Sequence, residues 1–317
     1  MLAGALGGHY DAIQLRYLQQ PPSRAFSQTN IMKKRARKKK ATDSKRGKSQ
    51  SGKAKALAWA KSVKEQLEVN IVEDQTINDA PILKDSEGEE PALIRSLIKA
   101  GNVVSSFVDA DGASSIWNTR DISSLEISKV KTLQPFAAYA KQLKKLKTLN
   151  LTWPIMAATT TDNINPLREL TGLRELSLWE CPTDSLEPLA NLSKLRVFNF
   201  SGNDDAALTD ISALAHCENL IELTLDTIAE SNLKPLSRLV KLRKLHLART
   251  DVLDLKHVGK LEKLESLTLY WTGVDDVKPL RNLKKLKHLE ITPGKDVSSL
   301  QLERLQKALP KCKFKIV

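Results

Sequence analysis

Cysteine is scarce in this sequence, and the three that occur form no pattern. Cys181, Cys217 and Cys312 are odd in number and far apart, and no C-x-x-C pair exists. Such a set builds neither a disulfide framework nor a zinc site. We therefore expect free thiols, no bound metal and a reducing compartment.

Long apolar runs and aromatic residues are also missing. No run of about 18 apolar residues occurs, so no membrane span is expected. Aromatic residues make up 5% of the 317 residues, whereas hydrophobic residues make up 41%, so any core must be mostly aliphatic. A chain of this length forms one large domain or two small ones.

Motifs for catalysis and cofactor binding are absent too. The sequence contains no H-E-x-x-H zinc motif, no nucleophile elbow and no glycine-rich dinucleotide loop. The GKS at 47–49 lacks the glycine five residues earlier that a phosphate loop requires. His246 could face Asp226 from a neighbouring strand, but no Ser or Cys nucleophile accompanies the two. We expect a protein that is not an enzyme and uses no cofactor.

Residues 1–31 leave two interpretations open. The segment is poor in acidic residues, and Arg24-Ala25-Phe26 precedes Ser27, which resembles the cleavage site of a mitochondrial presequence. Alternatively, translation begins at Met32 and the upstream residues are a wrongly assigned start. We favour the second interpretation, which predicts a cytoplasmic protein; a cleaved presequence would instead predict a mitochondrial one.

The positive charge is concentrated in one short segment. Of the net charge of +13, residues 32–53 carry eleven Lys and Arg against Asp43, and we expect this basic tail to be disordered. Residues 54–119 follow as an acidic linker with short helices and an N-terminal cap. Residues 54–317 together carry only +2, so we expect nucleic acid to bind, if at all, only through the tail.

The basic tail supports an alternative function. Residues 33–48 could bind nucleic-acid phosphates, with an affinity that falls steeply as salt rises, or serve as a nuclear import signal. The alternative to an interaction module is therefore a nucleic-acid-associated or nuclear factor. A lysine-rich terminus that only keeps the protein in solution is the simpler interpretation of the same residues.

Residues 120–297 repeat one pattern about eight times. Four of the seven intervals between copies are 22 residues long. The copies are a weak one from Ile122, then LKTLNLTWP (146–154), LRELSLWEC (173–181), LRVFNFSGN (195–203), LIELTLDTI (220–228), LRKLHLART (242–250), LESLTLYWT (264–272) and LKHLEITPG (286–294). One unit is too short to bury its own leucines, so the units must stack into a continuous sheet over a leucine core.

The L-x-x-L-x-L-x-x-N/C pattern resembles that of leucine-rich repeat proteins. The 22-residue length and the proline at one phase of the unit, as in LEPLANL and VKPLRNL, resemble the internalin-like and phosphatase-regulator-like branches. The resemblance implies an α/β solenoid, a horseshoe with a parallel concave sheet and short convex helical turns. The ending ALPKCKFKIV resembles the C-termini of bacterial, especially planctomycete, proteins of this kind.

Both ends of such a stack need a cover. At the N-terminal end, PALIRSLIKAG (91–101) predicts a helix, and Val103, Val104, Phe107 and Trp117 extend the cap. At the C-terminal end, residues 298–317 predict an amphipathic helix to Leu309. A strand should follow it, with Cys312, Phe314 and Ile316 facing inward.

Large side chains occur at positions of the repeat that point away from the leucine core. Counting from the first leucine, Trp179 and Tyr270 occupy position seven, while Trp153, Arg249 and Trp271 occupy position eight. His246 occupies position five. Binding hot spots favour Trp, Tyr and Arg, so we predict that these six residues bind a protein partner on the concave face of a monomer. The alternative is that the aromatics only pack along the rim of the sheet.

Overall fold

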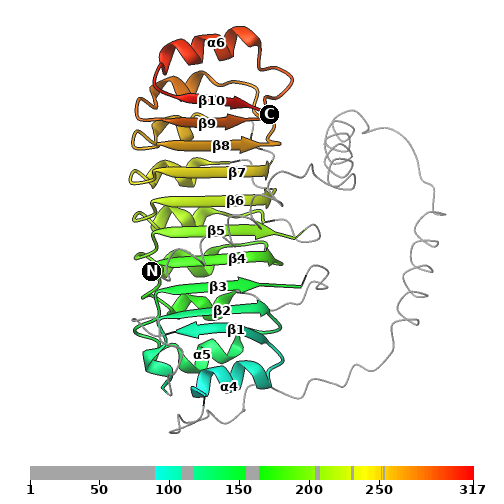
Figure 1. Ribbon diagram of the computed structural model, residues 1–317, viewed down its shortest axis with the longest axis vertical. Helices are drawn as coiled ribbons and strands as arrows, with labels where there is room; N and C mark the ends of the chain where they lie inside the picture. Colours follow the sequence, from blue (N-terminus) through cyan, green and yellow to red (C-terminus); the bar gives the residue numbers. More distant parts are fainter. Residues whose placement is uncertain are drawn as a thin grey trace, which may run out of the picture. The chain divides into compact units, whose positions relative to one another are not determined.

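The repeats form one sheet in the computed structural model. The structure describes residues 90–108, 118–154, 164–203, 208–229, 232–250, 252 and 254–317. The predictions for residues 1–31, for the basic tail, for most of the linker and for Trp117 lie outside these ranges. Within them, ten strands lie side by side in chain order from β1 to β10 (Figure 1).

Each copy of the pattern supplies one strand, and the leucines set its register. Leu245 of one strand pairs with Leu267 of the next, and Leu247 pairs with Leu269. All four are at most 2% exposed, because alternate residues of a strand point to the same face. The strands are β2 (Ser124–Lys129), β3 (Thr148–Thr152), β4 (Glu175–Cys181), β5 (Val197–Gly202), β6 (Glu222–Ile228), β7 (Lys244–Thr250), β8 (Ser266–Tyr270) and β9 (His288–Ile291). The predicted parallel solenoid over a leucine core is confirmed.

Short 3-10 turns carry the chain back behind the sheet. Proline is the second residue of four of them, where its missing N–H is not needed. Within a turn the bonds join residues three apart, as from Leu189 N to Leu186 O at 2.9 Å. The turns are η3 (Asn165–Glu169), η4 (Glu187–Asn191), η5 (Ser212–His216), η6 (Lys234–Arg238), η7 (Val258–Lys260) and η8 (Lys278–Asn282). They confirm the predicted short helical turns.

The N-terminal cap contains the predicted helix and one strand of unexpected direction. Helix α4 (Ala92–Lys99) buries Leu93, Ile94 and Leu97, and Gly101 follows it at φ 83°. Strand β1 (Val103–Val108) pairs antiparallel with β2, so the sheet is parallel only from β2 onward. The 3-10 turn η2 (Thr119–Asp121) and helix α5 (Gln134–Tyr139) complete this end.

The C-terminal cap matches its prediction except at one residue. Helix α6 (Ser299–Ala308) begins after Ser298, whose hydroxyl accepts from Gln301 N at 3.2 Å, and buries Leu305. Strand β10 (Lys313–Ile316) adds in parallel to β9, and Phe314 packs against the core. Ile316, predicted to face inward, is 52% exposed, and it lies near the end of β10, an edge strand of the sheet.

Candidate functional site

The predicted site residues follow the open face, the face of the sheet turned away from the leucine core. The structure separates them into three environments. Trp153 is only 2% exposed and belongs to the hydrophobic core. Its indole cannot reach a partner from there, so we correct its assignment as a binding residue: it packs inside the array.

Trp179 borders a groove across the open face. The groove has a volume of about 660 Å³. Short polar side chains are the largest group in its lining, and they leave room above the sheet. Its lining includes Ser124, Thr148, Asn150, Ser177, Asn199, Thr224, Ser266 and Thr268, together with Glu126, Glu175, Glu222, Lys244 and His246.

His246 joins this groove to an aromatic cluster. Its ring meets that of Tyr270 edge-on, with the centroids 5.9 Å apart. Its Nε2 is buried and finds no hydrogen-bond partner among the described residues. Burial is the main reason why the pKa of His246 is lowered to about 4; the charge of Glu290 acts to raise this pKa, and the charge of Arg249 acts to lower it. The imidazole is therefore neutral at physiological pH.

Because His246 is neutral in the folded protein, we expect the array to lose stability in acid. The unfolded chain binds a proton at His246 near pH 6.5, whereas the folded chain does so only near the depressed pKa. The histidine thus lowers the free energy of unfolding as the pH falls from about 6.5 towards 4. Between about pH 7 and pH 4.5, we expect wild type to lose about 2 kcal/mol more than His246→Gln, measured by urea unfolding. Equal losses in the two proteins would contradict the assignment.

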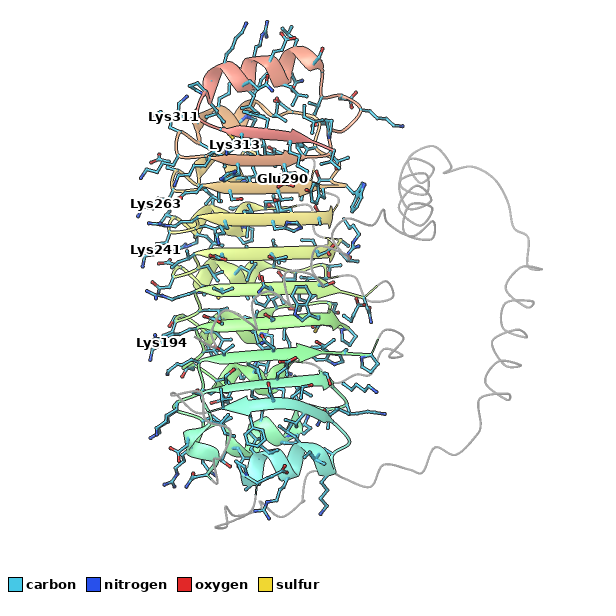
Figure 2. The ribbon with its side chains drawn as sticks, in the orientation of Figure 1. Lys194, Lys241, Lys263, Glu290, Lys311 and Lys313 are labelled. Atoms are coloured by element: carbon cyan, nitrogen blue, oxygen red, sulfur yellow. The ribbon has the colours of Figure 1, made fainter. Side chains whose placement is uncertain are left out.

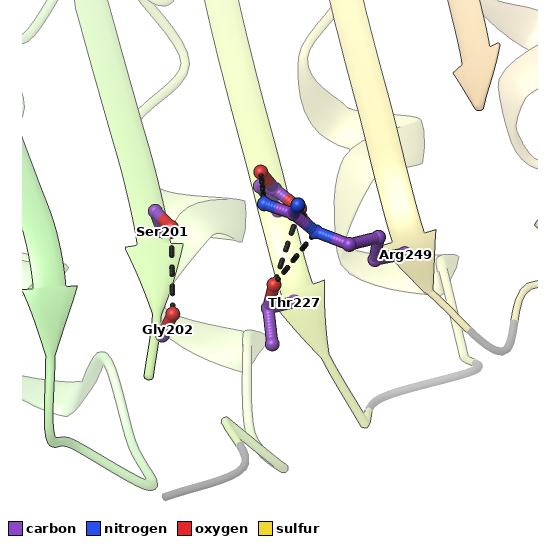
Figure 3. Close-up of polar contacts among 5 residues, drawn as sticks. Ser201, Gly202, Thr227 and Arg249 are labelled. Atoms are coloured by element: carbon purple, nitrogen blue, oxygen red, sulfur yellow. Dashed lines mark hydrogen bonds and ion pairs between the residues drawn. The ribbon is translucent and has the colours of Figure 1, made fainter. Parts of the chain in front are cut away.

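Arg249 is held by a buried partner. Its guanidinium forms a forked ion pair with Asp226 on β6, with Nε 2.8 Å from Oδ1 and Nη2 bonded to Oδ2 (Figure 3). Nε also donates to the Thr227 hydroxyl at 3.1 Å. The side chains of Asp226 and Arg249 are 2% and 13% exposed. Burial raises the pKa of Asp226, and the Arg249 and Thr227 bonds counteract it.

This ion pair corrects the suggested histidine dyad. Asp226 was expected on the open face beside His246, but it lies buried against Arg249. His246 pairs in register with Thr224 instead, while Asp226 pairs with Ala248. Sequence inspection missed the role of Asp226, although an acid at position seven beside an arginine at position eight of the next copy was a usable signal.

Tyr270 is also held by side chains of the two strands that follow it. It is 7% exposed, and its hydroxyl donates to Glu290 of β9. Lys315 of β10 donates to the same carboxylate at 3.0 Å and approaches the Tyr270 hydroxyl at 3.4 Å. Burial raises the pKa of Glu290, but the bonds from Tyr270 and Lys315 outweigh it and hold the pKa below its ordinary value. Glu290 lies on the open face near the C-terminal end (Figure 2). Neither Glu290 nor Lys315 was among the predicted site residues.

Trp271 lies partly exposed against Tyr270, with the ring centroids 6.0 Å apart. Its backbone is left-handed, at φ 48°. Glu180, Thr227 and Arg249 share this conformation at the same position of their repeats. L-residues seldom adopt this conformation, so its recurrence in four copies marks a shared change of chain direction after the strand, which fixes the direction of the Cα–Cβ bond of Trp271.

The two edges of the sheet carry opposite charge. We define the strand-start edge as the turn before each strand from β3 to β10 with the first strand residues. It holds fifteen Lys and Arg against five Glu, a net charge of +10. Its segments are 144–147, 171–175, 193–197, 218–222, 240–244, 262–266, 284–288 and 310–313. The loops after the strands are mainly acidic, with Asp184, Asp254, Asp275, Asp276 and Asp296.

Two of the three thiols lie in the hydrophobic core. Cys181 and Cys217 are fully buried, and burial raises the pKa of Cys217 to about 11 and that of Cys181 further. Across the described ranges, no group of three or more His, Cys, Asp or Glu residues could hold a metal ion. The same part of the chain contains no helix long and apolar enough to cross a membrane.

Comparison with known proteins identifies the fold. No family model matches the chain, and no curated protein is significantly similar to it. Internalin C2 of Listeria monocytogenes aligns over 74% of this chain and 95% of its own, with 22% identity and a TM-score of 0.52. A leucine-rich repeat protein of Leptospira interrogans aligns over 72% of this chain and 58% of its own, with 21% identity and a TM-score of 0.50. The chain therefore has the fold of the internalin-like leucine-rich repeat proteins.

Proposed function

We propose that this protein is a non-catalytic interaction module that binds a protein partner on the concave, open face of its sheet. The observation that carries the proposal is the groove beside Trp179. A groove of about 660 Å³ floored by hydroxyl and amide groups offers hydrogen bonds to a polypeptide and leaves room for its side chains.

Next to this groove, the cluster that His246 joins through Tyr270 is held in place before any partner arrives. Tyr270 is tied to Glu290 and Lys315, and Arg249 is tied to Asp226. Trp271 packs on Tyr270 in a backbone conformation that restricts its direction. A rigid aromatic loses little freedom on binding, which suits Trp179 and Trp271 as anchors, with His246 and Tyr270 as their support.

Several observations support binding without catalysis. The carboxylates of Asp226 and Glu290 are both engaged, the first by Arg249 and the second by Tyr270 and Lys315. The buried Cys181 and Cys217 have raised pKa values, which keeps them protonated and unreactive. Free cysteines suit the cytoplasm that we propose as the compartment, and we propose a monomer as the binding form.

Trp179→Ala is expected to weaken partner binding about 30-fold, because a central tryptophan anchor is worth about 2 kcal/mol. The full chain would serve as bait in affinity capture from native lysate, followed by quantitative mass spectrometry. Captured proteins that depend on Trp179 are the candidate partners, and their affinities would then be measured with purified components.

A matched control removes an exposed apolar side chain from another surface. Leu300 on α6 is 50% exposed, and Leu300→Ala should leave capture unchanged. Trp271→Ala tests the second anchor alone, since Tyr270 is too deeply buried to be removed without loss of stability. If both tryptophan variants capture the same proteins as wild type in the same amounts, the concave face is not the binding site.

A further inference from the structure

We propose that the strand-start edge binds the phosphate backbone of a nucleic-acid duplex. This edge carries a net charge of +10, whereas all of residues 91–317 carry +7, so the positive charge of the array is gathered on one side. The near-neutral total for residues 54–317 conceals this, because residues 65–90 contribute nine acidic residues against Lys84. The expectation that nucleic acid could bind only through the tail overlooked the edge.

The basic side chains form a row along the array. Lys194, Lys241, Lys263 and Lys311 lie one above another where β5, β7, β8 and β10 begin (Figure 2). Neighbouring strands are about 4.8 Å apart, so the eight strand starts from β3 to β10 span about 34 Å. One turn of B-form DNA has this length and presents about 20 phosphates over it. A duplex laid along the edge therefore meets basic groups over most of one helical turn.

Many of these charges are available to a ligand. Arg174, Lys194, Arg196, Lys263, Lys285 and Lys311 are exposed and form no ion pair with any described residue. The pairs that do exist along the edge, such as Lys287 with Glu265 at 2.6 Å, leave the lysine 63% exposed. Exposed pairs are worth roughly 0–1 kcal/mol, so a phosphate can replace the glutamate at little cost.

The charge is weakest in the middle of the edge, at the start of β6. Glu218 and Glu222 stand there without a basic residue of their own segment. Arg238 reaches Glu218 at 3.4 Å, and Lys244 of the next strand reaches Glu222 at 2.8 Å. These contacts screen both carboxylates, so the edge consists of two basic stretches joined by a nearly neutral step.

The chemistry of the edge fits phosphates better than a protein or a lipid surface. Its segments contain no Trp, Tyr or Phe, and Val240 is the large apolar side chain that is strongly exposed there, at 55%. Protein hot spots need aromatic anchors, and membrane binding needs apolar side chains to insert. The acidic loops on the opposite edge repel a polyanion and confine it to this side. The basic tail has the same sign and can contact the same polymer.

The test compares two full-length variants of equal charge. The edge variant carries Lys194→Gln, Arg196→Gln, Lys263→Gln, Lys285→Gln and Lys311→Gln. The control carries Lys234→Gln, Lys260→Gln, Lys278→Gln, Lys295→Gln and Lys307→Gln, all exposed residues of the turns, a loop and α6. The probe is a fluorescent DNA duplex of about 20 base pairs, followed by anisotropy between about 50 and 200 mM salt.

At about 100 mM salt, we expect the edge variant to bind the duplex about 100-fold more weakly, with a salt slope smaller by about 2–4. The control should stay within about 3-fold of wild type, and Trp179→Ala should bind the duplex normally, which separates this proposal from the groove. Unchanged binding by the edge variant, or equal losses in edge variant and control, would overturn the proposal. So would equally tight, edge-dependent binding of polyglutamate or of phosphatidylserine vesicles.

Discussion

Replacing Arg249 by methionine should lower the free energy of unfolding by about 3–5 kcal/mol, the usual cost of leaving a buried charge without its partner. Asp226 is 2% exposed on its side chain, and the Arg249 guanidinium supplies two of its hydrogen bonds. Methionine keeps the length and apolar stem of arginine but removes the charge. Urea unfolding followed by circular dichroism would measure the loss.

A second arginine on the same array provides the control. Arg243 pairs with Glu265 at 3.3 Å but is 61% exposed, so Arg243→Met should cost less than about 1 kcal/mol. Arg249→Lys should retain part of the stability, because lysine restores the charge without the forked geometry. A similar loss for Arg243→Met and Arg249→Met would show that burial of the pair contributes nothing.

Phe200→Ala should lower the free energy of unfolding by about 3–5 kcal/mol, because it leaves a cavity at a fully buried site. Phe200 is 0% exposed, pairs in register with Leu178 and Leu225, and lies 6.4 Å from Phe198 between ring centroids. The neighbouring repeats place leucine in this slot, so β5 alone fills it with an aromatic ring. Thermal and urea unfolding of the variant would give the loss.

Phe200→Leu separates the loss of volume from the loss of the ring. Leucine restores most of the volume and matches both neighbours, so we expect a cost below about 1.5 kcal/mol. If the leucine variant lost as much as the alanine variant, the aromatic contact with Phe198 would carry the stability instead of the filled space.

The sequence alone predicted the features that depend on spacing along the chain. The leucine interval gave the strands, the prolines at one phase gave the short turns, and the amphipathic pattern from residue 298 to Leu309 gave helix α6. These features repeat or are local, so one copy of the pattern contains the information. The antiparallel direction of β1 is neither repeated nor local, and nothing in Val103–Val108 encodes it.

The arrangement on the open face escaped prediction because it depends on pairs of residues in different copies. Asp226 looks solvated within its own repeat, and only Arg249 in the next repeat explains its burial. Tyr270 likewise seemed displayed, but Glu290 and Lys315 from the two following strands hold it. Trp153 seemed displayed by its position and is core. Position in a repeat predicts which way a strand residue faces, but not what covers it.

The two polar links between strands make the repeats unequal members of the array. Moving β7 to another place would separate Arg249 from Asp226, and inserting a unit after β8 would separate Tyr270 from Glu290 and Lys315. The strands from β6 to β10 must therefore keep their present order for these contacts to form. Duplication or loss of a unit is better tolerated between β2 and β5, where apolar stacking and the bond from Asn199 to Ser177 join the neighbours without a buried ion pair among the described side chains. Changes in repeat number should therefore concentrate there.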